Sequence, residues 1–155
     1  MGFLDKLMGL GGSKSEGKKE EIRNIFNSKV ENGGDYEVIA AMNMVTTKKL
    51  LKEIRTYYNY IIGYRSGEDP EMVIISTDAE LSEFDKPIYC KKSECERAKY
   101  LEQTGSFTVS CPALGGDPFN FFIIASTAWG GYVIDVSYVD EFTPFVEFFK
   151  KSFSK

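Results

Sequence analysis

Residues 56–77, TYYNYIIGYRSGEDPEMVIIST, decide the fold class of this protein. From Thr56 to Tyr64, aromatic and β-branched side chains occupy alternate positions, which is the period of a strand with one buried face. Residues 66–70 are typical of a turn, and Met72–Thr77 is a short apolar run of the kind found in buried strands. The stretch therefore predicts a β-hairpin, and with it an antiparallel sheet.

The segments on either side of this hairpin extend the sheet. Alternating or short apolar runs between turn residues predict further strands over residues 36–45, 87–91, 107–111, 119–125 and 132–138. Two segments, residues 46–56 and residues 93–103, fit either a helix or a strand, and both alternatives stay open. Because no regular crossover helices separate the strands, we expect them to be antiparallel.

Two helices flank the predicted strands. The first covers residues 20–30, ends at Asn32-Gly33-Gly34, and has an apolar face made by Ile22, Ile25, Phe26 and Val30. The second closes the chain, and its aromatic face is made by Phe142, Phe145, Val146, Phe149 and Phe153. Asp140 or Thr143 is the predicted N-cap, which would put Pro144 in the first turn, where proline is tolerated.

The predicted fold class is α+β. It consists of a mainly antiparallel sheet, or a partly open barrel, of about six to seven strands. One helix precedes the strands, and an amphipathic aromatic C-terminal helix packs on them.

The chain divides into an N-terminal segment, residues 1–19, and a single α+β domain, residues 20–155. A length of 155 residues suits one domain. Residues 11–19 are rich in Gly, Ser and Lys, which predicts a flexible linker. The apolar peptide ahead of it either lies weakly in a membrane interface or docks on protein, its own domain or a neighbouring subunit; its contact residues are Phe3, Leu4, Leu7, Met8 and Leu10.

The net charge of −4 is unevenly distributed. Residues 1–30 carry +2, whereas residues 31–155 carry −6. An acidic body repels phosphate backbones, so we expect no nucleic-acid partner. No apolar run is long enough for a membrane span, and the N-terminus lacks the signal-peptide pattern. We expect a cytoplasmic protein, with peripheral membrane contact left open.

The three cysteines predict neither a disulfide framework nor a metal site. Cys90, Cys95 and Cys111 are odd in number, and the chain has no histidine to complete a four-ligand zinc site. We interpret them as free thiols of a reducing compartment. Their role stays open.

No motif predicts catalytic, cofactor-binding or metal-binding residues. Residues 12–18, GSKSEGK, match most of the phosphate-loop pattern, but Lys19 stands where a hydroxyl is needed and no buried strand precedes them. Nucleophilic Ser or Cys usually needs an imidazole base, which this chain lacks. Carboxylate chemistry leaves no sequence signature, so a carboxylate-dependent hydrolase stays an alternative.

The order of elements over residues 36–153, several strands and then an aromatic-faced helix, resembles that of pleckstrin-homology-like domains, including their bacterial relatives. The helix at residues 20–30 has no counterpart in that layout. The resemblance implies a partly open barrel that binds lipid headgroups or peptides. Phosphoinositide sites of that family need a basic cluster in the first hairpin, and we find no convincing one here. The implied partner is therefore a protein.

These observations together predict a non-enzymatic protein-binding or adaptor module, with a weak N-terminal membrane anchor as an open addition. A carboxylate-dependent hydrolase and a structural subunit of a larger assembly are the alternatives. Two residues are candidates for a partner interface. Trp129 lies in a loop beside two glycines, where packing on the closing helix is the alternative, and Phe148 falls off the aromatic stripe of that helix.

Overall fold

A computed structural model describes residues 3–127 and 129–153, with side chains described from Ser15 onward. Its strands are β1 (Glu37–Lys49), β2 (Lys52–Arg65), β3 (Glu71–Thr77), β4 (Ile88–Lys91), β5 (Arg97–Leu101), β6 (Ser106–Ser110) and β7 (Phe119–Ile123). Helix α1 (Phe3–Lys29) precedes them and α2 (Val139–Phe148) follows, continued by a π-helical turn (Phe149–Phe153). Short 3₁₀ turns cover Gly33–Asp35, Lys92–Glu94, Pro112–Leu114 and Gly130–Tyr132.

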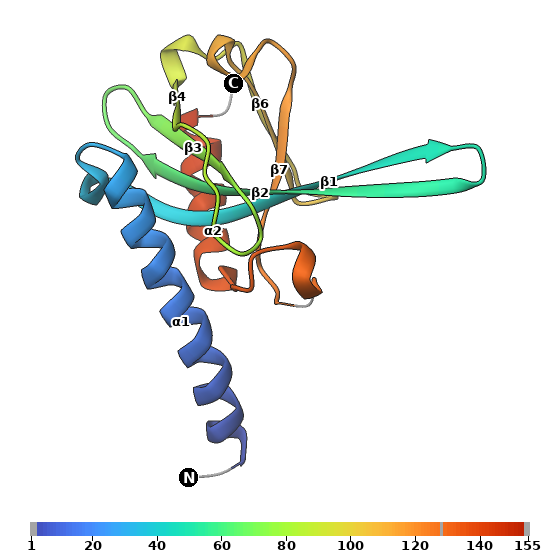
Figure 1. Cartoon of the computed structure of the whole chain (residues 1–155). Coiled ribbons are helices and arrows are strands. Elements are labelled where there is room, and N and C mark those ends of the chain that lie inside the picture. The colour runs from blue at the N-terminus through green and yellow to red at the C-terminus, as the bar shows by residue number, and fades with distance from the viewer. Residues whose placement is uncertain (1–2, 128, 154–155) are drawn as a thin grey trace.

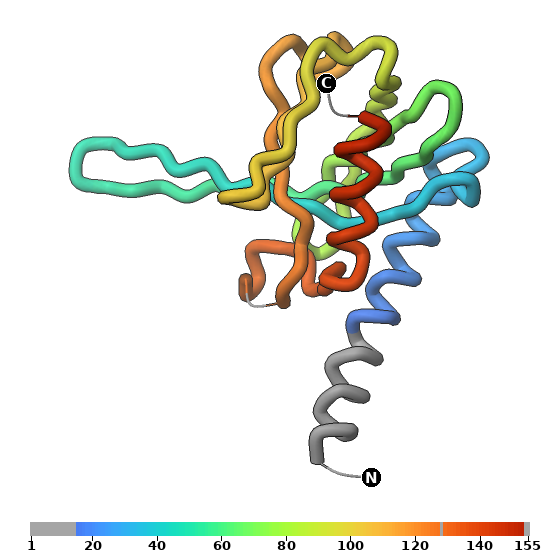
Figure 2. The backbone as a smooth tube through the Cα atoms, turned by 180° about the vertical axis from the view of Figure 1, so that it is seen from behind, coloured from blue at the N-terminus to red at the C-terminus, as the bar shows by residue number. Residues whose placement is uncertain are grey.

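The seven strands form one antiparallel sheet in the order β4-β3-β2-β1-β7-β6-β5. Helix α2 lies against one face of the curved sheet, and α1 lies on the other side (Figures 1 and 2). The predicted α+β class, an antiparallel sheet with one helix before its strands and one after them, is confirmed.

The hairpin read from residues 56–77 is present, with β2 and β3 paired from Asn59↔Thr77 to Arg65↔Glu71. Residues 46–56, left open between helix and strand, continue the ladder of β1 and β2 out to Lys49↔Lys52. Residues 93–103 contain β5. Ser93 starts no helix there, because its hydroxyl and backbone N–H both donate to the Asp69 carboxylate, at 2.9 and 3.2 Å.

The strand predicted at residues 132–138 is wrong. This segment is a 3₁₀ turn followed by irregular backbone, although alternate side chains along it are buried as the prediction required. Its backbone is held by other groups: the Asn59 amide accepts from Ile134 N–H at 2.9 Å and donates to the Tyr132 carbonyl at 3.1 Å. Tyr138 N–H donates to the Ile124 carbonyl at 2.8 Å. These partners satisfy buried backbone groups that a neighbouring strand would otherwise pair.

Helix α1 begins well before residue 20, so the flexible linker predicted over residues 11–19 is wrong for Ser15–Lys19. Tertiary contacts hold this turn of the helix. The Ser15 hydroxyl accepts from Ser137 N–H at 3.1 Å and donates to the Ser137 carbonyl at 3.3 Å. Lys19 Nζ lies 2.8 Å from the Glu141 carboxylate. Such partners offset the low helix propensity of glycine and serine.

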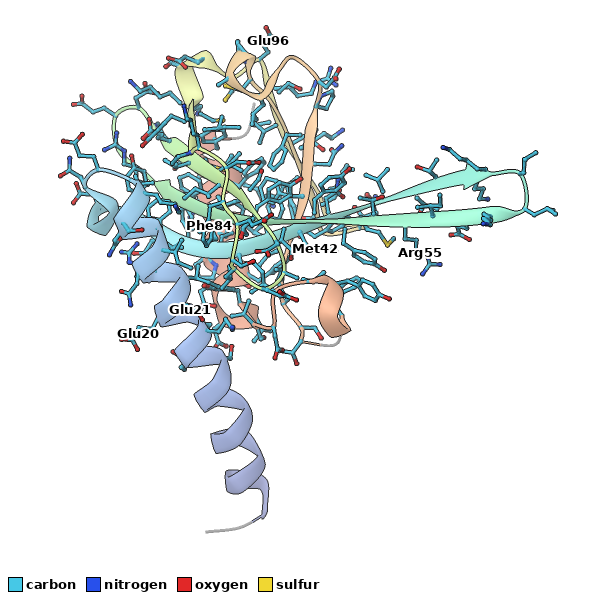
Figure 3. All side chains as sticks on the ribbon, viewed as in Figure 1. Glu20, Glu21, Met42, Arg55, Phe84 and Glu96 are labelled. Carbon is cyan, nitrogen blue, oxygen red and sulfur yellow. The ribbon has the colours of Figure 1, made fainter. Side chains whose placement is uncertain are left out.

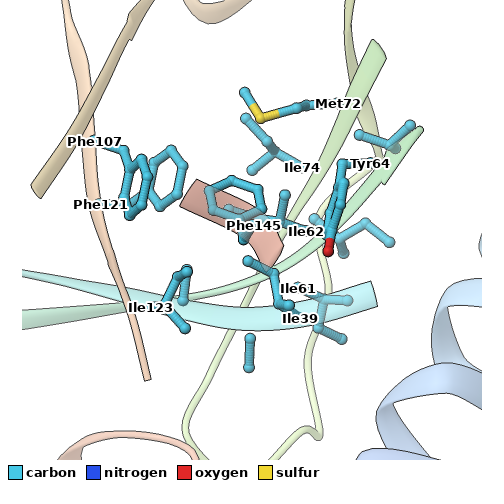
Figure 4. Packing of buried hydrophobic residues seen from close by; sticks show 14 of the residues in the cluster. Ile39, Ile61, Ile62, Tyr64, Met72, Ile74, Phe107, Phe121, Ile123 and Phe145 are labelled. Atoms are coloured by element: carbon cyan, nitrogen blue, oxygen red, sulfur yellow. The ribbon is translucent and has the colours of Figure 1, made fainter. Parts of the chain in front are cut away.

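Between the sheet and α2 the core combines aliphatic side chains with a cluster of aromatic rings (Figure 4). Phe145 of α2 packs edge-on against Tyr64 and Phe107, with ring centroids 4.9 Å apart in both pairs. Rings in this arrangement add to the free energy gained from burial alone. The aromatic face predicted for the closing helix is confirmed for Phe145, Phe149 and Phe153, which are fully buried.

The predicted N-cap of α2 is wrong. The helix begins at Val139 with Tyr138 as N-cap, and no side chain caps it. Asp140 therefore lies in the first turn and Pro144 lies in the second. A proline there removes one intrahelical hydrogen bond. Burial of Phe145 beside it compensates for this loss.

Candidate functional site: a projecting arm and an acidic groove

The outer parts of β1 and β2 form a two-stranded arm, residues 43–58, that projects from the body (Figure 1). Strand β7 pairs with β1 at Ala41 and Met42, and β3 pairs with β2 from Asn59 inward. Among the described residues, both outer edges of the arm beyond these points have no strand partner. Figure 3 shows Met42 at the root of the arm and Arg55 far out on it.

The two faces of the arm differ in chemistry. Side chains alternate across a strand, and directly paired residues share a face. One face carries apolar and β-branched side chains, with Val45, Ile54 and Tyr58 each between 43% and 46% exposed. The other face carries the polar pair Thr46↔Arg55 and the charged pair Lys48↔Glu53 beyond Met44↔Tyr57 at the root. The arm is therefore an amphipathic ribbon whose apolar face has no cover among the described residues.

The tip of the arm, residues 49–52, presents two leucines to solvent. Leu50 and Leu51 are fully exposed, at 106% and 102% of their reference surface. Lys49 and Lys52 face each other across the strand pair, and Lys48 is next to them. Between residues 43 and 58, four basic side chains and one acidic side chain give a net charge of +3.

The turn itself is locally unfavourable. Leu50 has φ = 50°, in the left-handed region where Gly or Asn is the ordinary choice. Strained residues of this kind collect at functional sites. Because Leu50 is fully exposed, its side chain gains no burial energy in the single chain that would offset this strain.

A groove of about 1090 Å³ lies at the root of the arm, beside the point where β3 ends and β2 continues outward. Tyr60 and Phe119 form its floor, with rings edge-on at 4.9 Å. Its apolar and aromatic lining residues are Tyr57, Tyr58, Tyr60, Ile74, Phe84, Ile88, Ala113, Leu114 and Phe119. Tyr58 also belongs to the apolar face of the arm, so the groove and that face form one continuous surface.

Three carboxylates, Asp78, Glu83 and Asp85, form the rim of this groove. They belong to residues 78–86, where four acidic side chains and one lysine give a net charge of −3. Asp78 holds the turn in place: it accepts from the hydroxyl of Ser82, from Ser82 N–H at 2.7 Å and from Glu83 N–H at 3.2 Å. The Ser82 hydroxyl and N–H lower the pKa of Asp78 to about 2. The rim is therefore negatively charged.

The chemistry of the rim suits binding better than acid–base catalysis. A general acid of a glycosidase-type carboxylate pair needs a raised pKa, whereas the pKa of Asp78 is lowered. Cys90, Cys95 and Cys111 are buried. Burial, and then the neighbouring Cys111 and Cys95, raise the pKa of the Cys90 thiol far above its ordinary value. A protonated thiol is a poor nucleophile.

Comparisons with protein-family models, curated proteins and solved structures gave no match. The pleckstrin-homology-like resemblance and the expected partner therefore remain predictions. In the part of the chain that the structure describes, no helix is both long and apolar enough to cross a bilayer. Within the same residues, no group of His, Cys, Asp or Glu side chains is arranged to hold a metal ion.

The residues that the sequence analysis proposed as contacts have different surroundings in the structure. The side chains of Phe3, Leu4, Leu7, Met8 and Leu10 lie outside those described. Trp129 is 41% exposed beside the 3₁₀ turn at Gly130–Tyr132. Phe148 is half-buried and packs on Tyr64, with ring centroids 4.7 Å apart, so its ring belongs largely to the core.

Sequence reasoning missed the arm and the groove. A signal for the tip was present, since Lys48-Lys49-Leu50-Leu51-Lys52 places two leucines among three lysines. That run fits a helical turn equally well, and only pairing between β1 and β2 makes it a tip. The groove had no signal, because its lining comes from four separate segments of the chain.

Proposed function

We propose that this protein is a non-enzymatic protein-binding module whose groove receives an extended, basic and apolar segment of another chain. One observation carries the proposal: an aromatic floor and an acidic rim lie beside an unpaired strand edge. Buried aromatic side chains supply most of the affinity in such contacts. The rim selects positive charge. The partner segment can add to the edge of β2 as a further strand.

The proposal includes a cytoplasmic location, which the three cysteines without disulfides favour. Peripheral contact with a membrane through the N-terminal peptide stays a second, separate proposal. Its test is co-sedimentation of the full chain with anionic vesicles, compared with a Phe3→Ser and Leu7→Ser variant. Equal binding of the two proteins would reject that anchor.

The groove proposal can be tested by selection from a random-peptide library displayed on phage, with the full chain immobilised. We expect enrichment of peptides that combine Lys or Arg with Leu, Ile or Val. A selected peptide, labelled and followed by fluorescence anisotropy, should bind more weakly as salt is raised, because rim charges are screened.

Rim variants locate the site. Glu83→Lys combined with Asp85→Lys should weaken peptide binding roughly tenfold or more. Both side chains are exposed, so the fold should persist. The matched control is Glu31→Lys combined with Glu68→Lys, which makes the same charge change at exposed positions away from the groove. Equal affinities of the two double variants, or enrichment of acidic peptides, would contradict the proposed function.

A further inference from the structure

We infer that the segment received by the groove is the arm of a second copy of this chain, so that two copies exchange arms in a closed dimer. The inference rests on the proposed function and names the partner of the same groove. It follows from the complementarity between the tip of the arm and the groove at its root.

The two ends of the arm carry opposite charge and matching apolar groups. The arm has a charge of +3 over residues 43–58, and its tip carries Lys49, Lys52 and two fully exposed leucines. The groove has a rim segment of charge −3 above the rings of Tyr60 and Phe119. Oppositely charged patches select a partner and fix its register. One molecule therefore carries both halves of a self-complementary contact.

The open edge of β2 connects these two ends. It runs from Lys52 at the tip to Tyr58 at the groove, and β3 leaves it free along this whole length. Seven residues of strand span about 23 Å at roughly 3.3 Å per residue. A second copy lying antiparallel along this edge therefore places each tip at the other copy's groove. Unpaired strand edges are ready templates for such pairing.

Twofold symmetry closes the assembly. In an antiparallel pair the same surface is used by both copies, so both grooves are filled and no further copy can add along the edge of β2. A single copy cannot make this contact, because its arm projects from the body (Figure 1) and the strand from Tyr58 to Lys52 separates its tip from its own groove. Partner contact also accounts for Leu50, which is both strained and exposed in the single chain.

The oligomeric state of the full chain tests the dimer. Sedimentation velocity over a concentration series should show a monomer–dimer equilibrium. The tip variant Leu50→Gly with Leu51→Ser should raise the dimer dissociation constant roughly tenfold or more. Its thermal midpoint should be unchanged or higher, since glycine suits a positive φ. The matched control, Val45→Ser with Thr56→Ser, changes one cross-strand pair midway along the arm and should raise the constant less.

Charge-reversal variants distinguish docking of each tip in the other copy's groove from any other contact between two copies. Lys49→Glu with Lys52→Glu reverses the tip, and Glu83→Lys with Asp85→Lys reverses the rim. We expect each variant alone to be monomeric. A mixture of the two variants should form a heterodimer, because each tip then meets a rim of opposite charge. Asp78 is left unchanged because it holds its own turn.

Three results would overturn the inference. The first is a wild-type chain that stays monomeric to its solubility limit, and the second is a variant mixture that forms no heterodimer. The third is a monomer whose leucine tip binds anionic vesicles, which would assign the tip to lipid. Peptide selection is repeated on the tip variant, whose groove is vacant. Basic peptides that bind the tip variant, together with a wild-type chain that stays monomeric, would reject the dimer and uphold the proposed function, whereas the absence of such peptides would reject both.

Discussion

The ring of Phe26 in α1 lies directly over the backbone of Gly63 in β2. A Cβ atom added at Gly63 would fall 2.1 Å from Cζ of Phe26, far inside van der Waals contact. Phe26 is fully buried and also packs edge-on against Tyr36, at 5.5 Å between centroids. The absence of a side chain at residue 63 therefore sets how closely α1 approaches the sheet.

Gly63→Ala should lower the free energy of unfolding by about 2–4 kcal/mol, because a fully buried ring must shift within a packed core. Chemical denaturation followed by circular dichroism would measure the loss. Gly34→Ala is the matched control, since a Cβ there meets nothing within 4 Å. A loss at Gly63 no larger than at Gly34 would show that α1 is not packed as described.

Asn59→Ala should destabilise the protein by about 2–4 kcal/mol. The variant removes both hydrogen bonds that hold residues 132–134, and it leaves the N–H of Ile134 buried without its acceptor. Asn24→Ala, on the exposed side of α1, should have no destabilising effect. Hydrogen exchange should show loss of protection at Ile134 before the β2–β3 ladder opens; uniform loss across the sheet would argue against a local role for Asn59.

Ser15→Ala should lower the free energy of unfolding by about 1 kcal/mol, since the hydroxyl bridges both backbone groups of Ser137. Ser28→Ala is the control, because its hydroxyl bonds only within α1, to the Ile25 carbonyl. Amide exchange in the wild-type chain should also be slow at residues 18 and 19. Fast exchange at those amides would restore the flexible linker predicted from the sequence.

Stability should fall at alkaline pH. Burial raises the pKa values of Tyr36, Tyr60 and Tyr64 from 10.0 to about 12. For Tyr36, the Glu71 carboxylate raises the pKa further, because it accepts a hydrogen bond from the Tyr36 hydroxyl. The unfolded chain loses these protons near pH 10 and the folded chain keeps them to about pH 12. The contribution of these tyrosines is therefore complete below pH 10 and is lost between pH 10 and 12.

Denaturant unfolding at pH 8, 10 and 11 would measure this slope, and phenolate absorbance would show which fraction of the tyrosines ionises late. Tyr60→Phe should reduce the slope. Tyr132→Phe, at a residue 65% exposed, is the matched control. A free energy of unfolding that stays constant to pH 11 would contradict the buried phenols.

The spacing of apolar side chains was enough to predict the structure of segments in which that spacing has a single period, either that of a strand or that of a helix. The alternation in residues 56–77 predicted a hairpin that β2 and β3 form, and the turn at residues 66–70 joins them. The aromatic stripe of the closing helix predicted the burial of Phe145, Phe149 and Phe153. In these segments the period of the sequence and the direction of burial agree, so no distant partner is needed to choose between alternatives.

The same reasoning failed where distant groups satisfy the backbone. Residues 132–138 have the alternation of a strand, but Asn59 and the Ile124 carbonyl take their hydrogen bonds and leave the segment irregular. Residues 15–19 have the composition of a linker, but contacts to Ser137 and Glu141 hold them as helix. Composition carries no information about partners that lie more than a hundred residues away.

The sequence by itself determined the α+β class, the antiparallel hairpin and the aromatic core, because each depends on the spacing of side chains within one segment. Only the tertiary structure decided that Leu50 and Leu51 are exposed at the tip of an arm and that a groove lies at the root of that arm. Their exposure depends on where β3 and β7 stop pairing, and the groove depends on four segments meeting at that point. Both are properties of strand register and sheet curvature, which long-range packing sets.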